Sequence, residues 1–589
     1  MATSRKPPFI PVFINGGKNI ANYFDFEHFN GKMSGKNFFR NCSIAMRLGS
    51  DEQNLTQRLH YISMADDGDA LFLLGVIHEF GLMNFKMNDT LSRTYYERGS
   101  TVGHSECMSR LSLFLAHGFG GERDIPRSIK LSELASKKGS VSAMLHLSFL
   151  YRFGDGVNTS TTNAYNLLET IGTAVLSNIT YQRLIMNSGV TRIFKDKFPS
   201  NMSKRVDSIR EFDKIRAQNG DIQSSIKQGI EKFYDNDIDE SVRLLMIGAE
   251  SNVGLAYGIL GNIYYYGIGK PKDELLGLSY YMKGLDLGDM VSIVEVALIT
   301  LTKESNMQEK LQAKTLLEMA AKEGNSRAIH YLGLFKLKGI IPYSVNISEA
   351  YQLFRIAKKK TYLPSIYYQA VMNQKGLGPK SSSMKALKKF MLFLELSFMF
   401  DDSANAWNSI ADDQIEYGLR LYQGLAFLGS EASMWNSEML CNKYGYNSSD
   451  WFNMQLKMGF HTALLKLAEQ KEKEGKTEEA KNIYLKTSEK ESKSSFALAW
   501  MNIWNPMESL KYLDQAYILE PRLIIAYYLS KIAIIFANIP QLLLFFWKDS
   551  PGLDMLFLLI SQNIWVSLVG ILLVFLHFFI GFKLNDIIE

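Results

Sequence analysis

The sequence predicts an all-α protein, an α-solenoid of helix pairs in about three blocks, followed by a C-terminal transmembrane helix. Three observations predict it. A spacing of small residues and glycines recurs about every 36–37 positions, apolar residues at helical spacing surround it, and residues 555–582 lack any Asp, Glu, Lys or Arg. A period of 20–50 residues marks a solenoid, because each unit buries its apolar face only against its neighbours.

Each copy of the repeat opens with a small residue, has a second small residue five positions later, and ends on a glycine eleven positions after the first. The best copy is Ala256, Gly261 and Gly267. We expect each terminal glycine to end the first helix of a pair in the left-handed conformation, which glycine adopts without steric cost. The same frame holds at Ala70/Gly75/Gly81, Cys107/Ser112/Gly118, Ala143/Ser148/Gly154, Ala328/Gly333/Gly339 and Ser365/Ala370/Gly376.

The second helix of each unit carries paired aromatic or aliphatic residues at helical spacing, as in 278–284 and 350–354. Breaks in the period, rich in Asn, Ser and Lys, divide the array. The predicted organisation is an N-terminal region 1–67, a first block 68–176, a linker 177–220, a second block 221–380, a linker 381–405, a degenerate third block 406–522, an apolar membrane-proximal helix 523–547, a transmembrane segment 555–582 and a tail 583–589.

The last part of the chain is the most apolar. The segment 555–582 is long enough to cross a bilayer, which takes about 20 apolar residues. The stretch 523–547 is interrupted by Lys531, Asn538 and Pro540, and three interpretations stay open: a second span, an interfacial or partner-docked helix, or the last helix of the array. The amino terminus lacks the uninterrupted apolar run of about 7–15 residues that an export signal requires.

Composition excludes some functions. A net charge of +5, with Lys and Arg scattered among Asp and Glu, gives no nucleic-acid footprint. The cysteines at 42, 107 and 441 are too few and too far apart for a disulfide framework or a zinc set. His104 and Cys107 have a metal-ligand spacing, but Cys107 occupies the small packing position of the repeat, which favours a structural role.

No motif points to catalysis or to a cofactor. Gly118-Phe-Gly-Gly resembles a phosphate loop, yet it aligns with the inter-helix turns of the other repeats and lacks the Gly-Lys-Ser/Thr ending. No nucleophilic elbow and no zinc-binding motif is present. His146 and His330 lie in first helices, where a packed histidine is expected. We therefore expect a protein that is not an enzyme and that binds neither metal nor cofactor.

Eight Asn-x-Ser/Thr sequons occur, a modest excess over chance. Asn88 and Asn158 fall in inter-helix loops, where a glycan could project outward. The candidate N-glycosylation sites are Asn88, Asn158, Asn178 and Asn346.

Residues 255–289 carry the pattern Ala-x-x-x-Leu-Gly-x-x-Tyr-x-x-Gly-x-Gly, followed by a Tyr-Tyr helix and Gly-Asp. This resembles the Sel-one-like repeat, a relative of the tetratricopeptide repeat. The order of the parts points to one family among the proteins that carry this repeat. The chain has repeats, an interruption, more repeats, a second interruption, a final pair of helices and one apolar span. In this order, from about residue 68 to 582, the chain resembles the Sel-one-like adaptor subunit of the Hrd-type ubiquitin ligase of the endoplasmic reticulum membrane.

The resemblance implies a non-catalytic, single-pass adaptor whose repeats lie in the lumen. Its implied partners are a multispanning RING ubiquitin ligase, a mannose-binding lectin and misfolded glycoprotein clients. The ligase would dock on the membrane-proximal segment, through Leu523, Ile524, Tyr527, Tyr528, Ile532, Ile535 and Phe536. The missing export signal favours an alternative, a tail-anchored cytosolic scaffold for signalling or trafficking partners, while a hydrolase built on the same repeats has no nameable nucleophile and base.

Overall fold

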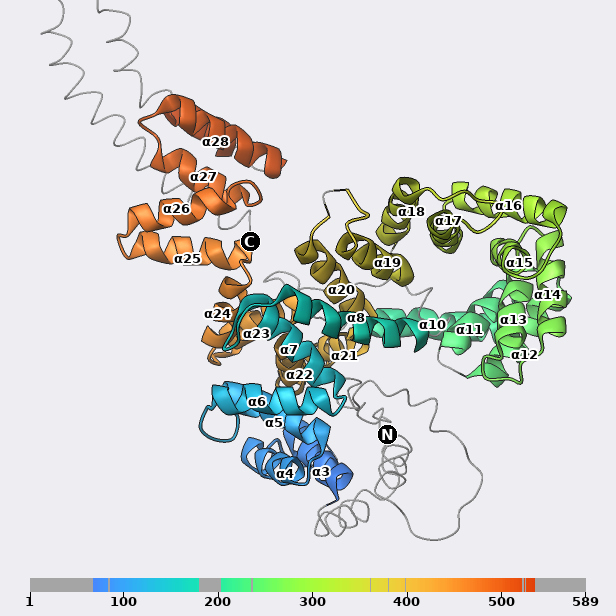
Figure 1. The fold of residues 1–589 in the computed structure, drawn as a ribbon, viewed down its shortest axis with the longest axis horizontal. Coiled ribbons are helices and arrows are strands. Elements are labelled where there is room, and N and C mark those ends of the chain that lie inside the picture. Colours follow the sequence, from blue (N-terminus) through green and yellow to red (C-terminus); the bar gives the residue numbers. More distant parts are fainter. Residues whose placement is uncertain are drawn as a thin grey trace, which may run out of the picture. The chain divides into compact units, whose positions relative to one another are not determined.

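In the computed structural model the described residues are 67–534, without 83–84, 179–202, 235–236, 361, 380, 398, 522–523 and 525. All regular elements among them are helices (Figure 1). The described residues up to Leu440 form one compact unit, and those from Cys441 onward form a second.

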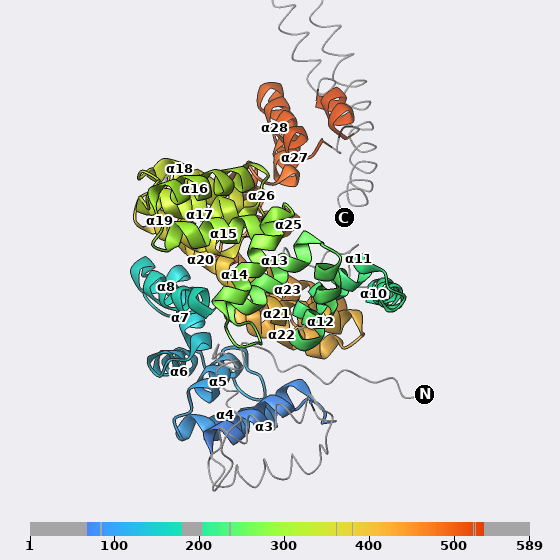
Figure 2. The same ribbon diagram turned by 90° about the vertical axis from the view of Figure 1, so that its right-hand side faces the viewer.

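Most of the first unit consists of consecutive helix pairs. They are α3 (Gly68–Phe80), α4 (Asp89–Thr101), α5 (Ser105–His117), α6 (Ile125–Lys137), α7 (Val141–Phe153), α8 (Thr161–Asn178), α10 (Ser203–Gln218), α11 (Ile222–Tyr234), α12 (Ile238–Glu250), α13 (Gly254–Tyr266), α14 (Glu274–Asp286), α15 (Met290–Thr302), α16 (Met307–Lys322), α17 (Ser326–Lys338), α18 (Ile347–Lys359), α19 (Leu363–Gln374), α20 (Ser383–Ser397), α21 (Phe400–Ala411) and α22 (Ile415–Phe427). Figure 2 shows the pairs from α13 to α20 stacked side by side. The predicted solenoid is confirmed.

The second unit contains further helix pairs. Its helices follow α23 (Glu431–Tyr444), which spans the boundary between the units, and are α24 (Ser449–Lys457), α25 (His461–Lys473), α26 (Thr477–Thr487), α27 (Ser492–Met501) and α28 (Pro506–Leu519). Helices α25 and α26 form one pair, and α27 and α28 form the next.

The frame glycines end the first helices as predicted. Gly81, Gly118, Gly154, Gly267 and Gly339 are the C-caps of their helices, with φ between 61° and 73°. At each of them the backbone N–H bonds a carbonyl of the last turn, which satisfies a group that the helix end leaves open. Gly376 differs slightly: α19 ends at Gln374, and Gly376 follows the cap residue with φ 71°.

The mid-helix glycines of the frame admit an aromatic ring from the partner helix. A Cβ on Gly75 would lie 2.3 Å from the Tyr96 ring, and one on Gly261 would lie 2.5 Å from the Tyr281 ring. Both rings are fully buried. Gly333 faces Phe354 in the same way, more loosely, at 3.0 Å. These glycines are therefore required by close helix packing.

Two predicted linkers contain helices of the array. Residues 381–405 include α20, which pairs with α19 and fully buries Leu387 and Phe390 on one side. Ser382, from the polar run that suggested this linker, is exposed in the turn before α20. Part of 177–220 is α10, which packs on α11.

Helix α20 also packs against α8, so segments far apart in the sequence meet within the first unit (Figure 1). The Tyr165 and Phe390 rings lie 5.6 Å apart at this contact. The Thr173 and Tyr367 hydroxyls lie 3.0 Å apart, across 194 positions of sequence. The chain thus returns to its first block after passing through the second.

Among the described residues, none of the helices combines the length and hydropathy needed to cross a bilayer. The predicted span 555–582, the tail 583–589 and the N-terminal residues 1–66 lie outside those residues.

Candidate functional site

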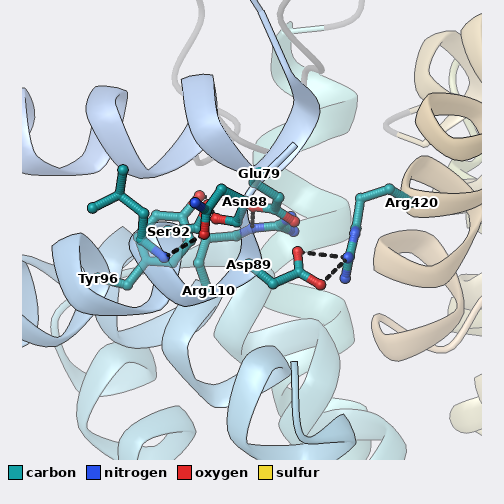
Figure 3. A network of polar contacts seen from close by, with 8 residues as sticks. Glu79, Asn88, Asp89, Ser92, Tyr96, Arg110 and Arg420 are labelled. Atoms are coloured by element: carbon teal, nitrogen blue, oxygen red, sulfur yellow. Dashed lines mark hydrogen bonds and ion pairs between the residues drawn. The ribbon is translucent and has the colours of Figure 1, made fainter. Parts of the chain in front are cut away.

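A buried polar network joins the first three helices of the array (Figure 3). The Glu79 carboxylate, at the end of α3, has no exposed surface. It accepts a hydrogen bond of 2.7 Å from the Tyr96 hydroxyl of α4 and one of 3.1 Å from Nε of Arg110 of α5. Nη2 of Arg110 donates to the other carboxylate oxygen. Because both charges are buried and paired, they fix the register of one repeat on the next.

Burial and the neighbouring Glu79 carboxylate raise the pKa of Tyr96 well above its usual range. The hydroxyl therefore stays protonated at neutral pH and acts as a donor. Both oxygens of the Glu79 carboxylate are engaged and shielded from solvent, so the network positions helices and offers no general base.

A second network of the same composition lies in the second block. Glu295 of α15 is fully buried and pairs with Arg327 of α17, whose Nη2 donates to the carboxylate at 3.0 Å. The Tyr266 hydroxyl of α13 donates to the same carboxylate at 2.7 Å. This network links three successive first helices. Two blocks of the array therefore use a buried glutamate, an arginine and a tyrosine to lock neighbouring repeats.

The first block is in contact with α22, which comes from the far end of the unit. Both carboxylate oxygens of Asp89, the first residue of α4, lie 2.7 Å from Nη2 of Arg420 (Figure 3). The Arg420 guanidinium lies over the Phe119 ring, 4.0 Å from its centroid. Asp89 also stands at a helix N-terminus, where a negative charge is favoured.

Aromatic contacts extend this interface in both directions along α22. The Tyr417 ring packs on Phe80 at the end of α3, with 5.5 Å between the centroids. Phe427 stacks on the His146 ring of α7 at 3.7 Å. All residues of α22 from Gly418 to Phe427 are buried. Helix α22 thus lies across the first helices of three consecutive repeats.

The two histidines predicted to be packed are confirmed as such. His146 and His330 are buried, and Nδ1 of each lies 2.8 Å from a serine hydroxyl, of Ser132 and Ser365 respectively. Burial lowers the pKa of both to about 3, with smaller contributions from His117 and Arg327. Both rings are therefore neutral at physiological pH.

The residues considered for metal and phosphate binding have structural roles. The His104 ring caps α5 by accepting from the backbone N–H of Cys107, which is itself fully buried. No cluster of three metal-ligating side chains occurs in the described part of the chain. Gly120 has a φ of 66°, and a Cβ there would collide with the backbone of Asp89, so the loop at 118–121 is a tightly packed turn between helices.

The predicted docking residues divide into three groups. Ile524, Tyr528 and Ile532 are exposed. Tyr527 is half-buried; it stacks on Tyr517 and donates to Asp514 at 2.6 Å. Leu523, Ile535 and Phe536 lie outside the described residues.

The stretch 526–534 packs on the last helix pair, with Ile534 in its core. Among the three open interpretations of 523–547, the described part fits the last helix of the array. One side of this stretch is nevertheless apolar and uncovered by the described residues.

The candidate glycosylation sites lie at helix ends and in turns. Asn88 and Asn346 are exposed N-caps whose Oδ1 accepts a backbone N–H of α4 and α18. Asn158 is exposed in the turn before α8, and Asn178 is the last residue of α8. Glycosylation at all four stays a prediction.

The fold and these networks define the class of protein: an α-solenoid scaffold whose surfaces suit protein partners. Five segments match the Sel1 repeat family model, at residues 68–104, 105–140, 141–170, 254–289 and 326–362. These five segments are therefore similar to the Sel1 repeat, and a helical repeat scaffold of this kind suits a protein-interaction adaptor.

Solved structures to which the chain is similar include a protective antigen from uropathogenic Escherichia coli that displays an SLR fold, at 16% identity, covering 82% of this chain and 94% of that one, with a TM-score of 0.25. A Sel1 repeat protein from Oxalobacter formigenes shares 17% identity, covering 55% and 99%, with a TM-score of 0.19. Yeast Tom70 shares 12% identity, covering 80% and 97%, with a TM-score of 0.25. No curated protein sequence matches the chain.

The sequence reasoning missed the two glutamate networks and the α22 interface. A weak signal existed for the networks. Glu79 stands nine positions after Ala70, the first small residue of its copy. At the same position of the repeat, two other copies carry Ala116 and Tyr265. A charged residue on the apolar side of a helix indicates a buried partner.

Proposed function

We propose that the chain is a non-catalytic adaptor of an endoplasmic-reticulum-associated degradation ubiquitin ligase complex. Its repeats would recruit misfolded luminal glycoproteins and a mannose-binding lectin, and its membrane-proximal end would hold and stabilise a multispanning RING ligase. The apolar segment 555–582 would anchor it in the endoplasmic reticulum membrane with the repeats in the lumen.

One observation carries the proposal: one side of 526–534 is apolar and is not covered by any of the described residues, and this stretch directly precedes the most apolar part of the sequence. Tyr528 is 58% exposed and Ile532 47%, although the stretch that carries them packs on the last helix pair. Ile518, at the end of α28, is also exposed. Large apolar side chains clustered beside a predicted anchor favour a protein partner in or at the membrane.

The test is affinity purification of the full-length chain from gentle detergent, asking whether a multispanning RING ligase elutes with it. The double variant Tyr528→Asp/Ile532→Asp should lose the ligase, because each substitution places a charge in the docking surface. The matched control is Leu275→Asp on α14, where an even more exposed leucine belongs to the first unit. Equal loss in both variants would contradict the assigned docking surface, and absence of any ligase with the unmodified chain would contradict the function.

Topology provides an independent test. If the repeats are luminal, an endoglycosidase should shift the mobility of the native chain, and the shift should shrink in the Asn88→Gln and Asn158→Gln variants. A chain without glycans whose repeats are digested by protease in intact microsomes would instead support the tail-anchored cytosolic scaffold.

A further inference from the structure

The contact between α22 and the first block has the geometry of a helix bound in a groove. From Tyr417 to Phe427 the helix axis extends about 15 Å, at 1.5 Å per residue. Packed helices lie about 8–10 Å apart, so three first helices span about 16–20 Å between the outer axes, and the side chains at the two ends of this segment reach the outer helices. The observed contacts agree, because Tyr417 meets α3, Arg420 meets the turn after α5, and Phe427 meets α7.

The contacting residues of the block occupy related positions of the repeat. Phe80 and His117 both stand ten positions after the first small residue of their copies, and His146 stands three positions after that of the next copy. Positions three and ten lie on the same side of a helix, two turns apart. The groove is therefore a product of the repeat itself and is lined by α3, α5 and α7, together with Asp89, the first residue of α4.

The chemistry of the interface is that of specific recognition. A charged anchor, Arg420 on Asp89, lies between two aromatic contacts, and the arginine also stacks on Phe119. Nη1 of Arg420 is buried without a hydrogen-bond partner. Aromatic and arginine anchors carry most of the binding energy in helix-in-groove interfaces.

We propose that the groove of α3, α5 and α7 is a binding site for a partner helix, which the chain's own α22 fills in this structure. The partner presents an arginine three residues after one aromatic residue and seven residues before another, the pattern of Tyr417, Arg420 and Phe427. Binding of the partner displaces α22 together with α21, with which it pairs. This inference goes beyond the adaptor role and does not depend on which ligase or client the chain serves.

Because α22 is tethered to the groove, it competes at a high effective concentration, and a free helix binds weakly while α22 is in place. Weakening α22 alone should therefore open the site. Arg420→Glu faces the Asp89 carboxylate with a like charge and leaves every residue of the groove intact.

The experiment measures binding of a fluorescent synthetic peptide of residues 412–430 to the full-length chain in mild detergent. We expect the Arg420→Glu chain to bind the peptide at least tenfold more tightly than the unmodified chain. A peptide that itself carries Arg420→Glu should lose this binding. The Arg420→Glu peptide should bind again to a chain that carries Asp89→Arg, because Arg at position 89 attracts the glutamate of the peptide and repels the chain's own Arg420.

Circular dichroism and melting temperature verify that each variant is folded. If a folded Arg420→Glu chain binds neither peptide, or binds both equally, α22 is a fixed part of the solenoid and the proposal is wrong. If the Arg420→Glu chain does not fold, the proposal is tested instead by hydrogen exchange of the unmodified chain with and without the peptide. Excess peptide should then speed exchange of the α22 amides, and unchanged exchange would overturn the proposal. A peptide-independent dimer on size exclusion would also overturn it, since a second copy would then occupy the groove.

Discussion

Removal of Arg110 should destabilise the first block strongly, because it leaves the fully buried Glu79 carboxylate without its ion-pair partner. In the structure Glu79 accepts from Nε and Nη2 of Arg110 and from the Tyr96 hydroxyl. Hydrogen bonds to charged groups contribute about 1.5–3 kcal/mol each. Loss of two gives about 3–6 kcal/mol, which agrees with the roughly 3–5 kcal/mol for breaking a buried ion pair. We expect Arg110→Met to cost about 4 kcal/mol.

The matched control is Arg127→Met, which breaks an ion pair of the same composition on the surface. Arg127 and Glu97 lie 3.3 Å apart, with 48% and 39% of their side chains exposed. Such pairs contribute about 0–1 kcal/mol. The two variants remove the same side-chain atoms, but the Glu97 carboxylate that Arg127→Met leaves behind is exposed and keeps Arg93 at 3.5 Å.

Urea denaturation followed by circular dichroism gives the change in the free energy of unfolding, and hydrogen exchange localises it to α3, α4 and α5. The double variant Glu79→Leu/Arg110→Met removes both charges and should recover most of the loss, since no buried charge remains unpaired. A cost below about 1 kcal/mol for Arg110→Met, or a double variant no more stable than the single one, would refute the reasoning.

Three further predictions concern buried histidines, helix packing and a helix cap. Because burial lowers the pKa of His146 and His330 from 6.5 to about 3, only the unfolded chain gains these protons between those pH values. Stability should fall as the pH falls through this window, by about 2 kcal/mol per histidine at pH 5. The urea midpoint should therefore drop less between pH 7 and pH 5 in the His146→Gln or His330→Gln chain. An equal drop in the variant and unmodified chains would contradict the lowered histidine pKa. Gly261→Ala should cost about 1–3 kcal/mol of stability through its clash with Tyr281. Tyr281→Leu should cost less in the Gly261→Ala chain than in the unmodified chain, because it removes the ring that clashes. Melting temperatures showing that the two costs simply add would argue against the clash. Asn306→Ala removes the capping box of α16 and should cost about 1 kcal/mol by thermal denaturation, whereas Asn306→Ser, which keeps a capping oxygen, should be nearly neutral.

The repeat itself could be predicted from the sequence because its determinants are local. Helix α13 ends where the backbone becomes left-handed, and Gly267 occupies that position. This requirement for glycine acts within one turn of the helix. The packing of Gly261 on Tyr281 spans only about twenty positions, inside one repeat. The predicted linker 381–405 includes α20, which is the second helix of the unit that α19 opens and which buries Leu387 and Phe390 on one side.

The α22 interface could not be predicted in this way, because its determinants are neither local nor periodic. Arg420 and Asp89 are 331 positions apart, and each alone is indistinguishable from a surface residue of an amphipathic helix. Their pairing depends on the path of the array, which returns through α20 to α8. That path results from the small rotation between successive repeats, summed over the whole second block. In a solenoid the repeats can therefore be predicted from the local sequence. The contacts that join distant repeats, at which partners would compete, depend on the rotations summed over all the repeats between them.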